Sequence, residues 1–210
     1  MKYVDELCER YPILSDNKAE IEKVCDKLIK CFESLGKLLV CGNGGSCADA
    51  EHITGELMKG FLKKRPISPE KAEQMKNRCP EIEDSVIESL QQGLPTIALD
   101  SHGALNTAFM NDCNPDLIYA QQVLGYGREG DTFIGISTSG NAKNVCAAAT
   151  VAKSLGMYTV ALAGRDGGKL AKISDDAIIV KESETFKIQE LHLPVYHAIC
   201  AEIEDFFFKE

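Results

Sequence analysis

The sequence lacks a cysteine pair at C-x-x-C spacing and any long apolar run. Its nine cysteines are scattered, and an odd number fits poorly with a closed disulfide framework, which favours reduced thiols in a cytoplasm. The first six residues have no apolar signal core, and no run approaches the roughly 20 apolar residues that cross a bilayer. We therefore expect a cytoplasmic protein without a membrane segment.

Positive charge is also scarce. The formal net charge is −9, and the only cluster of basic residues is Lys63-Lys64-Arg65. Because nucleic-acid backbones are bound through Lys and Arg, this composition argues against a nucleic-acid partner. A small anion remains a suitable ligand, since local backbone N–H groups can outweigh a distant net charge.

Helical and strand-like periodicities alternate along the chain. Apolar positions at helical spacing over residues 17–35 predict an amphipathic helix that ends at Gly36. Five apolar runs predict strands, at Lys37–Cys41, Thr96–Leu99, Thr132–Ile136, Tyr158–Ala163 and Ala177–Val180. This alternation predicts a single α/β domain over residues 1–210. Its five-stranded parallel sheet would lie between two layers of helices, preceded by N-terminal helices within residues 1–36.

Residues 62–93 break the alternation. They are charged, contain three prolines and include no strand-like run. We expect an insertion with helices over Pro69–Arg78 and Ile82–Gln91. A solvated surface excursion is favoured over a lid above a site.

A glycine-rich turn, Gly42–Ser46, follows the first predicted strand and opens a helix. Free N–H groups at such a helix start can hold an anion. A dinucleotide fingerprint would need glycine where Cys47 stands, and the Gly-Lys-Ser/Thr ending of a P-loop is absent. The turn is therefore either a ligand contact of another kind or a tight turn without a ligand.

A second turn, Ser137–Asn141, follows the strand predicted at Thr132–Ile136 and is also expected to open a helix. Three successive hydroxyls in it can surround a phosphate monoester together with backbone N–H groups, whereas an N-cap role would explain only one of them. Two such turns after two strands of one sheet predict a phosphorylated ligand at the carboxyl ends of the strands.

Two predicted helices carry side chains that suit acid–base or metal chemistry. His52 and Glu56 are four positions apart after the glycine turn and share one helical face, although such a pair is frequent by chance. Gln189 and His197 are eight positions apart in the final predicted helix, Thr185–Phe208, and look toward a common side.

The same final helix contains two further notable residues. His192 lies on the opposite shoulder from Gln189 and His197. Pro194 removes a backbone donor and is expected to kink the helix.

In their order along the chain, these motifs resemble the phosphoheptose isomerases of the sugar-isomerase (SIS) fold. The matching motifs are GNGGS, H-x-x-x-E, Asn111-Asp112, GREGD at Gly127–Asp131, STSGN, and I-Q-E-x-H-x-x-x-x-H at Ile188–His197. The resemblance covers nearly the whole chain except residues 62–93. It implies a single SIS domain that interconverts an aldose and a ketose phosphate, with sedoheptulose 7-phosphate as the favoured substrate.

The resemblance also implies roles for individual residues. Substrate would be bound by Asn43, Gly44, Gly45, Ser46, Glu56, Asn111, Asp112, Ser137, Thr138, Ser139 and Gln189. A zinc ion would be bound by His52, Glu56, Gln189 and His197. Glu56 would be the catalytic base, and His197 would move protons at the sugar oxygens.

Three departures from the family pattern bear on substrate choice. Ala142 stands where another serine is usual, Phe186 replaces an acidic residue, and Lys59-Gly60 replaces a segment that usually contains arginine. They leave the type of site intact and the exact sugar open.

Two other functions fit the same fold. A non-catalytic sugar-phosphate sensor or adaptor would need the two turns but not the four proposed zinc ligands. An aminosugar-phosphate isomerase is a weaker alternative, because that branch normally carries two such domains in one chain. By resemblance we expect a homotetramer, since an isolated subunit would leave the apolar N-terminal helices poorly covered, and neighbouring subunits could complete each pocket.

Overall fold

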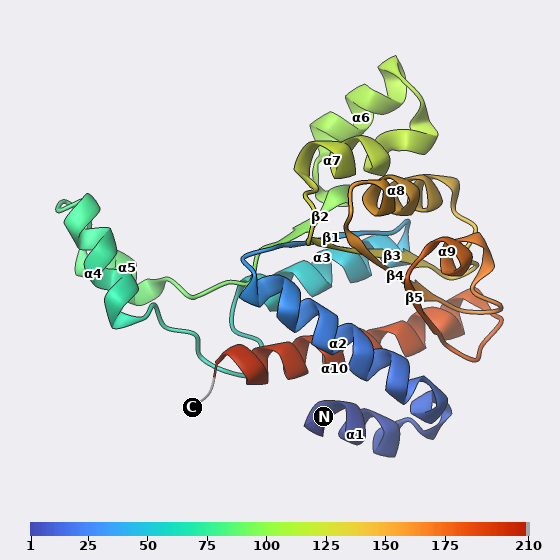
Figure 1. Ribbon diagram of the computed structural model, residues 1–210, viewed down its shortest axis with the longest axis horizontal. Coiled ribbons are helices and arrows are strands. Elements are labelled where there is room, and N and C mark those ends of the chain that lie inside the picture. Colours follow the sequence, from blue (N-terminus) through green and yellow to red (C-terminus); the bar gives the residue numbers. More distant parts are fainter. Residues whose placement is uncertain (209–210) are drawn as a thin grey trace.

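The computed structural model describes residues 1–208, and a parallel sheet forms its centre (Figure 1). The strands are β1 (Leu38–Cys41), β2 (Thr96–Ala98), β3 (Thr132–Ser137), β4 (Tyr158–Ala163) and β5 (Asp176–Ile179). They pair in the order β2-β1-β3-β4-β5, and every pairing is parallel. The prediction of a five-stranded parallel sheet is confirmed, and each predicted strand is right to within one residue at either end.

Helices cover both faces of the sheet (Figure 1). One face carries α1 (Lys2–Arg10), α2 (Lys18–Glu33), α3 (Gly45–Met58) and α10 (Thr185–Phe207). The other carries α6 (Gly103–Asp112), α7 (Ile118–Tyr126), α8 (Lys143–Ser154) and α9 (Gly168–Ile173). Short 3-10 helices occur at Pro12–Asn17, Leu99–Ser101 and Pro115–Leu117.

Two apolar clusters fill the space on either side of the sheet. Val40 and Ile134 belong to the cluster under α2, α3 and α10, whereas Leu39 and Phe133 belong to the cluster under α7 and α8. Alternate residues of a strand point to opposite faces, so each central strand supplies both clusters. The predicted three-layer α/β/α architecture is confirmed.

Most apolar residues of the N-terminal helices are covered within the chain, and Ile13, 45% exposed, is an exception. Val4, Leu7 and Leu14 are at most 3% exposed. The expectation that one subunit would leave these helices poorly covered is therefore wrong. Large exposed apolar side chains gather instead on α6, α7 and the turn between them: Leu105, Met110, Leu117, Leu124 and Tyr126.

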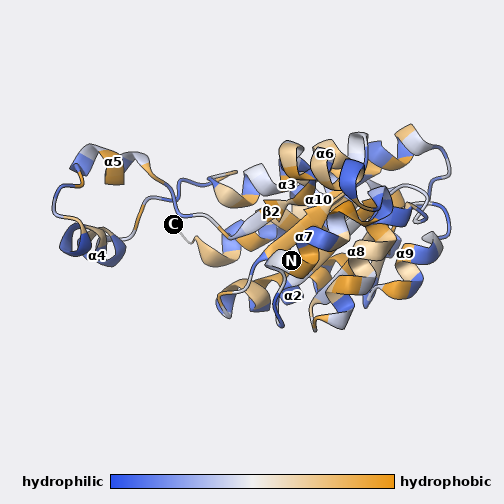
Figure 2. Cartoon of the chain, turned by 90° about the horizontal axis from the view of Figure 1, so that it is seen from above, coloured by the Kyte–Doolittle hydropathy of each residue, from blue (hydrophilic) through white to orange (hydrophobic). Residues whose placement is uncertain are grey.

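The insertion forms α4 (Pro69–Arg78) and α5 (Asp84–Ser89), which project away from the sheet (Figures 1 and 2). The second helix is shorter than expected, because it ends at Ser89. The excursion closes at its base, where Pro66 and Gln91 form an antiparallel bridge and Gln92 N–H donates to the Arg65 carbonyl at 2.7 Å. This projecting shape agrees with a surface excursion.

The final helix, α10, continues through Pro194 from Thr185 to Phe207. Within residues 1–208, no helix combines the length and apolar character needed to cross a membrane.

His192 on α10 is fully buried. Burial lowers the pKa of His192 to about 4 from an ordinary value of 6.5.

This burial predicts a pH-dependent stability. Because the unfolded chain takes up a proton on His192 at higher pH than the folded chain does, part of the free energy of unfolding is lost as the pH falls from about 6.5 to about 4. Replacing His192 with Gln should remove roughly 3 kcal/mol of that decline. Urea unfolding of both proteins at pH 7 and pH 4 measures it, and equal declines would contradict the prediction.

Candidate functional site at two sheet-edge turns and the α3–α10 interface

The glycine turn connects β1 to α3 at the carboxyl edge of the sheet. The helix begins at Gly45, directly after Gly44, whose φ of +58° is rarely adopted by residues with a side chain. At Gly42 a Cβ would lie 2.4 Å from the Ser46 carbonyl oxygen. The backbone of the turn at Gly42 therefore packs directly against Ser46, which is buried.

Asn43 is fixed by a residue that sequence reasoning missed. Its side-chain amide and that of Asn144 each donate to the other's oxygen at 2.9 Å. The Tyr119 hydroxyl donates to the Gly42 carbonyl at 2.7 Å. Asn144 lies in α8 and Tyr119 in α7, so the helices on one face of the sheet fix the glycine turn.

The hydroxyl turn follows β3 at the same edge of the sheet. Ser137 is the buried last residue of the strand, and Thr138 and Ser139 are partly exposed in the turn. Ser139 Oγ accepts a hydrogen bond from Asn141 N–H at 3.2 Å. The expectation that this turn opens directly into a helix needs correction, because α8 begins only at Lys143.

Gly140 makes the hydroxyl turn possible. Its φ is +64°, and a Cβ there would lie 1.9 Å from the Gly167 carbonyl oxygen.

The two turns lie at the ends of neighbouring strands, because β1 and β3 pair in parallel with Cys41 opposite Gly135. The Asn43–Asn144 pair connects the glycine turn to α8, the helix that follows the hydroxyl turn.

The structure brings His52, Glu56 and His197 together from α3 and α10. His52 Nε2 lies 3.1 Å from Glu56 Oε1, and the imidazole rings of His52 and His197 have centroids 4.9 Å apart. The Glu56 carboxylate also pairs with Lys59 Nζ at 3.1 Å. The contact between the two imidazole rings joins side chains that are more than 140 residues apart along the chain.

Two further side chains, Tyr196 and Asp49, orient His52 and were not predicted. The Tyr196 hydroxyl donates to Asp49 Oδ1 at 3.2 Å and lies 3.0 Å from His52 Nδ1. Because this hydroxyl already donates to Asp49, its oxygen accepts from His52 Nδ1–H. His52 Nε2 is then directed toward Glu56.

His197 is in an apolar setting. Its ring lies 5.4 Å from the Phe61 ring and 5.0 Å from the Tyr196 ring, and its Nε2 is buried without a hydrogen-bond partner among residues 1–208. Burial, and then the neighbouring His52, lower the pKa of His197, and Glu56 opposes them. This environment favours a neutral imidazole at neutral pH.

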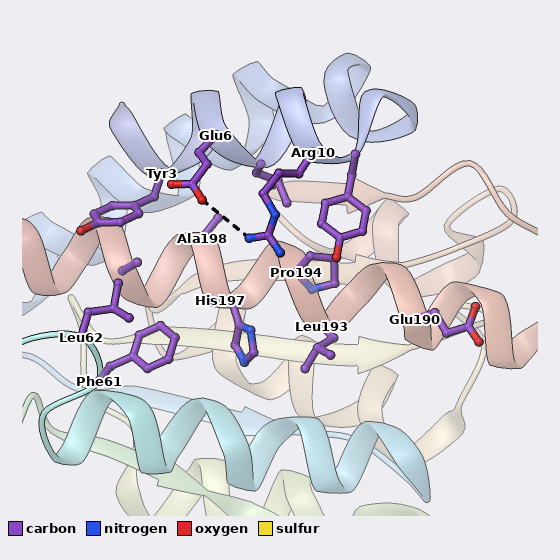
Figure 3. A pocket seen from close by; sticks show the side chains of 13 residues that line it. Tyr3, Glu6, Arg10, Phe61, Leu62, Glu190, Leu193, Pro194, His197 and Ala198 are labelled. Carbon is purple, nitrogen blue, oxygen red and sulfur yellow. Dashed lines mark ion pairs between the residues drawn. The ribbon is translucent and has the colours of Figure 1, made fainter.

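His197 also lines a pocket of about 370 Å³ between α1, α10 and the segment Phe61–Leu62 (Figure 3). An ion pair between Glu6 and Arg10, at 3.7 Å, forms part of its wall. His197 is thus shared between this pocket and the His52–Glu56 pair. The contribution of α1 was not predicted, because nothing in its spacing indicates which helix it packs against.

Other predicted site residues lie elsewhere. Gln189 lies against the glycine turn, with its Nε2 only 2.4 Å from the position of a Cβ on Gly45. Eight helical residues, or about 12 Å of rise, separate it from His197. Asn111 and Asp112 end α6, bond to each other at 2.8 Å and are exposed. They belong to a helix rather than a loop, on the opposite face of the sheet from α10 (Figure 1).

The donor types at the His52 cluster fit a zinc ion. His52 and Glu56 offer nitrogen and oxygen, and the unpartnered Nε2 of His197 adds a second nitrogen. Their ligand atoms do not all lie within 4.8 Å of one another. Over residues 1–208 the group that does consists of Cys47, Glu51 and Asp100, beside the glycine turn.

Comparison with known proteins identifies the family. A family model described as the SIS domain matches residues 2–92 and 84–164. A phosphoheptose isomerase of Aneurinibacillus thermoaerophilus is 38% identical over 189 residues, covering 90% of this chain and 82% of that protein. One from Helicobacter pylori is 40% identical, covering 86% of this chain and 80% of that protein. The chain belongs to the phosphoheptose isomerase family.

Solved structures of phosphoheptose isomerases have the same fold. The one from Francisella tularensis matches with a TM-score of 0.74 at 28% identity, covering 98% of this chain and all of that one. The one from Neisseria gonorrhoeae matches with a TM-score of 0.70 at 31% identity, covering 96% and 98%. The family and fold expected from the motifs are confirmed, while the roles of individual residues in this phosphoheptose isomerase family member stay predictions.

The crowding at Gly140 predicts the effect of a single methyl group. Gly140→Ala would place a Cβ against the Gly167 carbonyl and displace the hydroxyl turn, so we expect inorganic phosphate to bind at least about tenfold more weakly. Titration calorimetry with phosphate measures this. Gly125→Ala in α7 is the matched control, since nothing lies within 4 Å of a Cβ there. Equal phosphate affinity in the two variants would contradict the prediction.

Proposed function

We propose that this protein interconverts a ketose and an aldose phosphate, with sedoheptulose 7-phosphate as substrate, in the cytoplasm. The observation that carries the proposal is the convergence of Glu56 and His197 from two helices, over a sheet whose carboxyl edge carries the two turns proposed to bind an anion. Membership in the phosphoheptose isomerase family supports the same reaction. The exact sugar is inferred from the family alone.

The reaction requires a base and a group that moves protons between oxygens. A proton leaves the carbon beside the carbonyl, an enediol forms, and a proton returns one carbon away. The Glu56 carboxylate, with its side chain only 13% exposed, would take and return the carbon-bound proton. The neutral imidazole of His197 would accept and donate protons at the sugar oxygens.

The two turns would hold the substrate. The hydroxyls of Ser137, Thr138 and Ser139 would bind the phosphate, with backbone N–H groups of the turn completing its shell. Asn43, Gly44, Gly45 and Ser46 would lie against the sugar, and Gln189 reaches the same turn from α10.

Two of the family departures have visible local consequences. Ala142 is the N-cap residue of α8 and provides no side-chain acceptor there, so one hydroxyl is missing near the phosphate turn. Lys59, in the Lys59-Gly60 segment that replaces one usually containing arginine, pairs with the Glu56 carboxylate and with the Gly60 carbonyl, both at 3.1 Å. A cation next to the proposed base therefore persists despite the change.

A zinc ion would be held by His52, Glu56 and His197. Gln189, the fourth ligand that the family resemblance implies, lies instead against the glycine turn, about 12 Å of helix rise from His197. When bound, the zinc ion would polarise the carbonyl and stabilise the negative charge of the enediolate as a Lewis acid. Tyr196 and Asp49 would orient the imidazole of His52 toward it. A carboxylate that binds the ion tightly cannot act as a free base at the same time. Measuring whether activity depends on zinc therefore distinguishes the role of Glu56 as a metal ligand from its role as the base.

The proposal predicts that two substitutions abolish turnover. Glu56→Gln and His197→Ala should each lower kcat by at least about a thousandfold while sugar-phosphate binding stays near normal, since both leave the turns intact. The assay uses five-, six- and seven-carbon sugar phosphates, with and without zinc or a chelator.

Undiminished activity in either variant would contradict the assigned roles. Activity that changes with neither zinc nor a chelator would contradict the role of the metal but not the isomerase activity. Binding without turnover of any sugar phosphate by the unaltered protein would favour a non-catalytic sensor.

We also propose that the protein forms a homotetramer through the exposed apolar surface of α6 and α7. Light scattering should then give about four times the chain mass of 22.9 kDa. Leu124→Glu, at a side chain 57% exposed on α7, should reduce the assembly, because it places a charge in the apolar surface. Val86→Glu on α5, at a side chain 46% exposed, is the control that should not. A monomeric unaltered protein would contradict the proposal.

A further inference from the structure

The short basic run Lys63-Lys64-Arg65 ends in a buried arginine. Arg65 is 1% exposed, and its Nε lies 2.8 Å from Oε1 of Glu204, which is also 1% exposed. The Phe208 ring covers the guanidinium at 4.6 Å. A fully buried ion pair loses much of its hydration, so its strength depends on how completely its remaining donors and acceptors are used.

The remaining donors of Arg65 hold the end of α3. Nη1 donates to the Leu57 carbonyl at 2.7 Å, and Nη2 donates to the Glu56 carbonyl at 3.0 Å. These carbonyls are in the last turn of α3, where the helix has no N–H groups left to pair with them. Arg65 therefore fixes the backbone of the proposed base directly.

The Glu204 carboxylate holds the segment that follows α3. It accepts hydrogen bonds from the N–H groups of Phe61 at 2.8 Å, Leu62 at 2.7 Å and Lys63 at 3.1 Å. The ring of Phe61 packs against His197. One ion pair is thus connected to Glu56 through its guanidinium and to the surroundings of His197 through its carboxylate.

We propose that Arg65 is a positioning residue, which acts through Glu204 to set the place of the Glu56 carboxylate relative to the His197 imidazole. This inference rests on the proposed isomerase function. Misplacing a catalytic group by about 1 Å can cost about a hundredfold in rate, so a pair that fixes both helices affects turnover without touching substrate. Lysine cannot substitute, because its single ammonium does not match three acceptors arranged in a plane.

A merely structural pair would stabilise the fold without affecting the chemistry, and the chain offers a matched control for that case. Asp131 is 2% exposed and accepts hydrogen bonds from Lys37 N–H at 2.9 Å, Lys37 Nζ at 2.5 Å and Arg128 N–H at 2.8 Å. It directly precedes β3, at the opposite edge of the sheet from the two turns. Its loss should cost stability of the same kind at a distance from Glu56 and His197.

The experiment compares Arg65→Lys and Asp131→Asn with the unaltered protein by thermal unfolding and steady-state kinetics. We expect Arg65→Lys to lower kcat about 10- to 100-fold with KM changed less than about threefold, because the phosphate turns are untouched. Asp131→Asn should lower the unfolding temperature comparably and keep kcat within about twofold. If Arg65→Lys does not fold, Glu204→Gln removes the charge partner while keeping Arg65 in place, with the same expected result.

Three outcomes overturn the positioning role. The first is a folded Arg65→Lys or Glu204→Gln protein with kcat within about twofold of the unaltered protein. The second is an Asp131→Asn protein that loses kcat to the same extent, since that would indicate a general effect of lost stability. If the unaltered protein turns over no sugar phosphate, the proposed function itself fails, and the positioning role fails with it.

Discussion

The packing of α3 against α10 is the constraint on which the rest of the site depends. Both helices lie over the same face of the sheet, and Ile53, Leu57, Ile199 and Ile203 belong to the same apolar cluster. The polar residues of the two helices occur at the margin of this contact. His52 and Glu56 can therefore meet His197 only while the apolar contact holds the helices at their observed separation and register.

Strand order places the glycine turn and the hydroxyl turn beside one another. In a parallel sheet all carboxyl ends meet at one edge, and β1 and β3 are direct neighbours although 90 residues lie between them. The long intervening segment includes the projecting excursion, which closes on itself through Pro66 and Gln91. An insertion of this kind leaves the spacing of the turns unchanged, because its two ends are already side by side.

The site divides binding from chemistry. The proposed phosphate site would use backbone groups and hydroxyls held by tightly packed glycines, which need a rigid main chain. The proposed acid–base groups instead lie on long side chains, and neighbouring residues set the directions of such side chains, as Tyr196 does for His52. Breaking one of these buried polar contacts would leave an unpaired donor or acceptor in an apolar region, which is costly, so the side chains stay in the observed directions.

The sequence by itself determined the strands, the layer architecture and the identity of the two turns, because those depend on local periodicity and on short motifs. Spacing also placed His52 and Glu56 on one face, as helical geometry requires. Only the tertiary structure decided that Arg65 is buried rather than solvated, that Tyr196 and Asn144 support the site, and that α1 forms a pocket wall. Each of these depends on a partner from a distant part of the chain, such as 139 residues away for Arg65 and Glu204 and 147 residues away for Tyr196 and Asp49. No local pattern encodes which buried polar groups will meet.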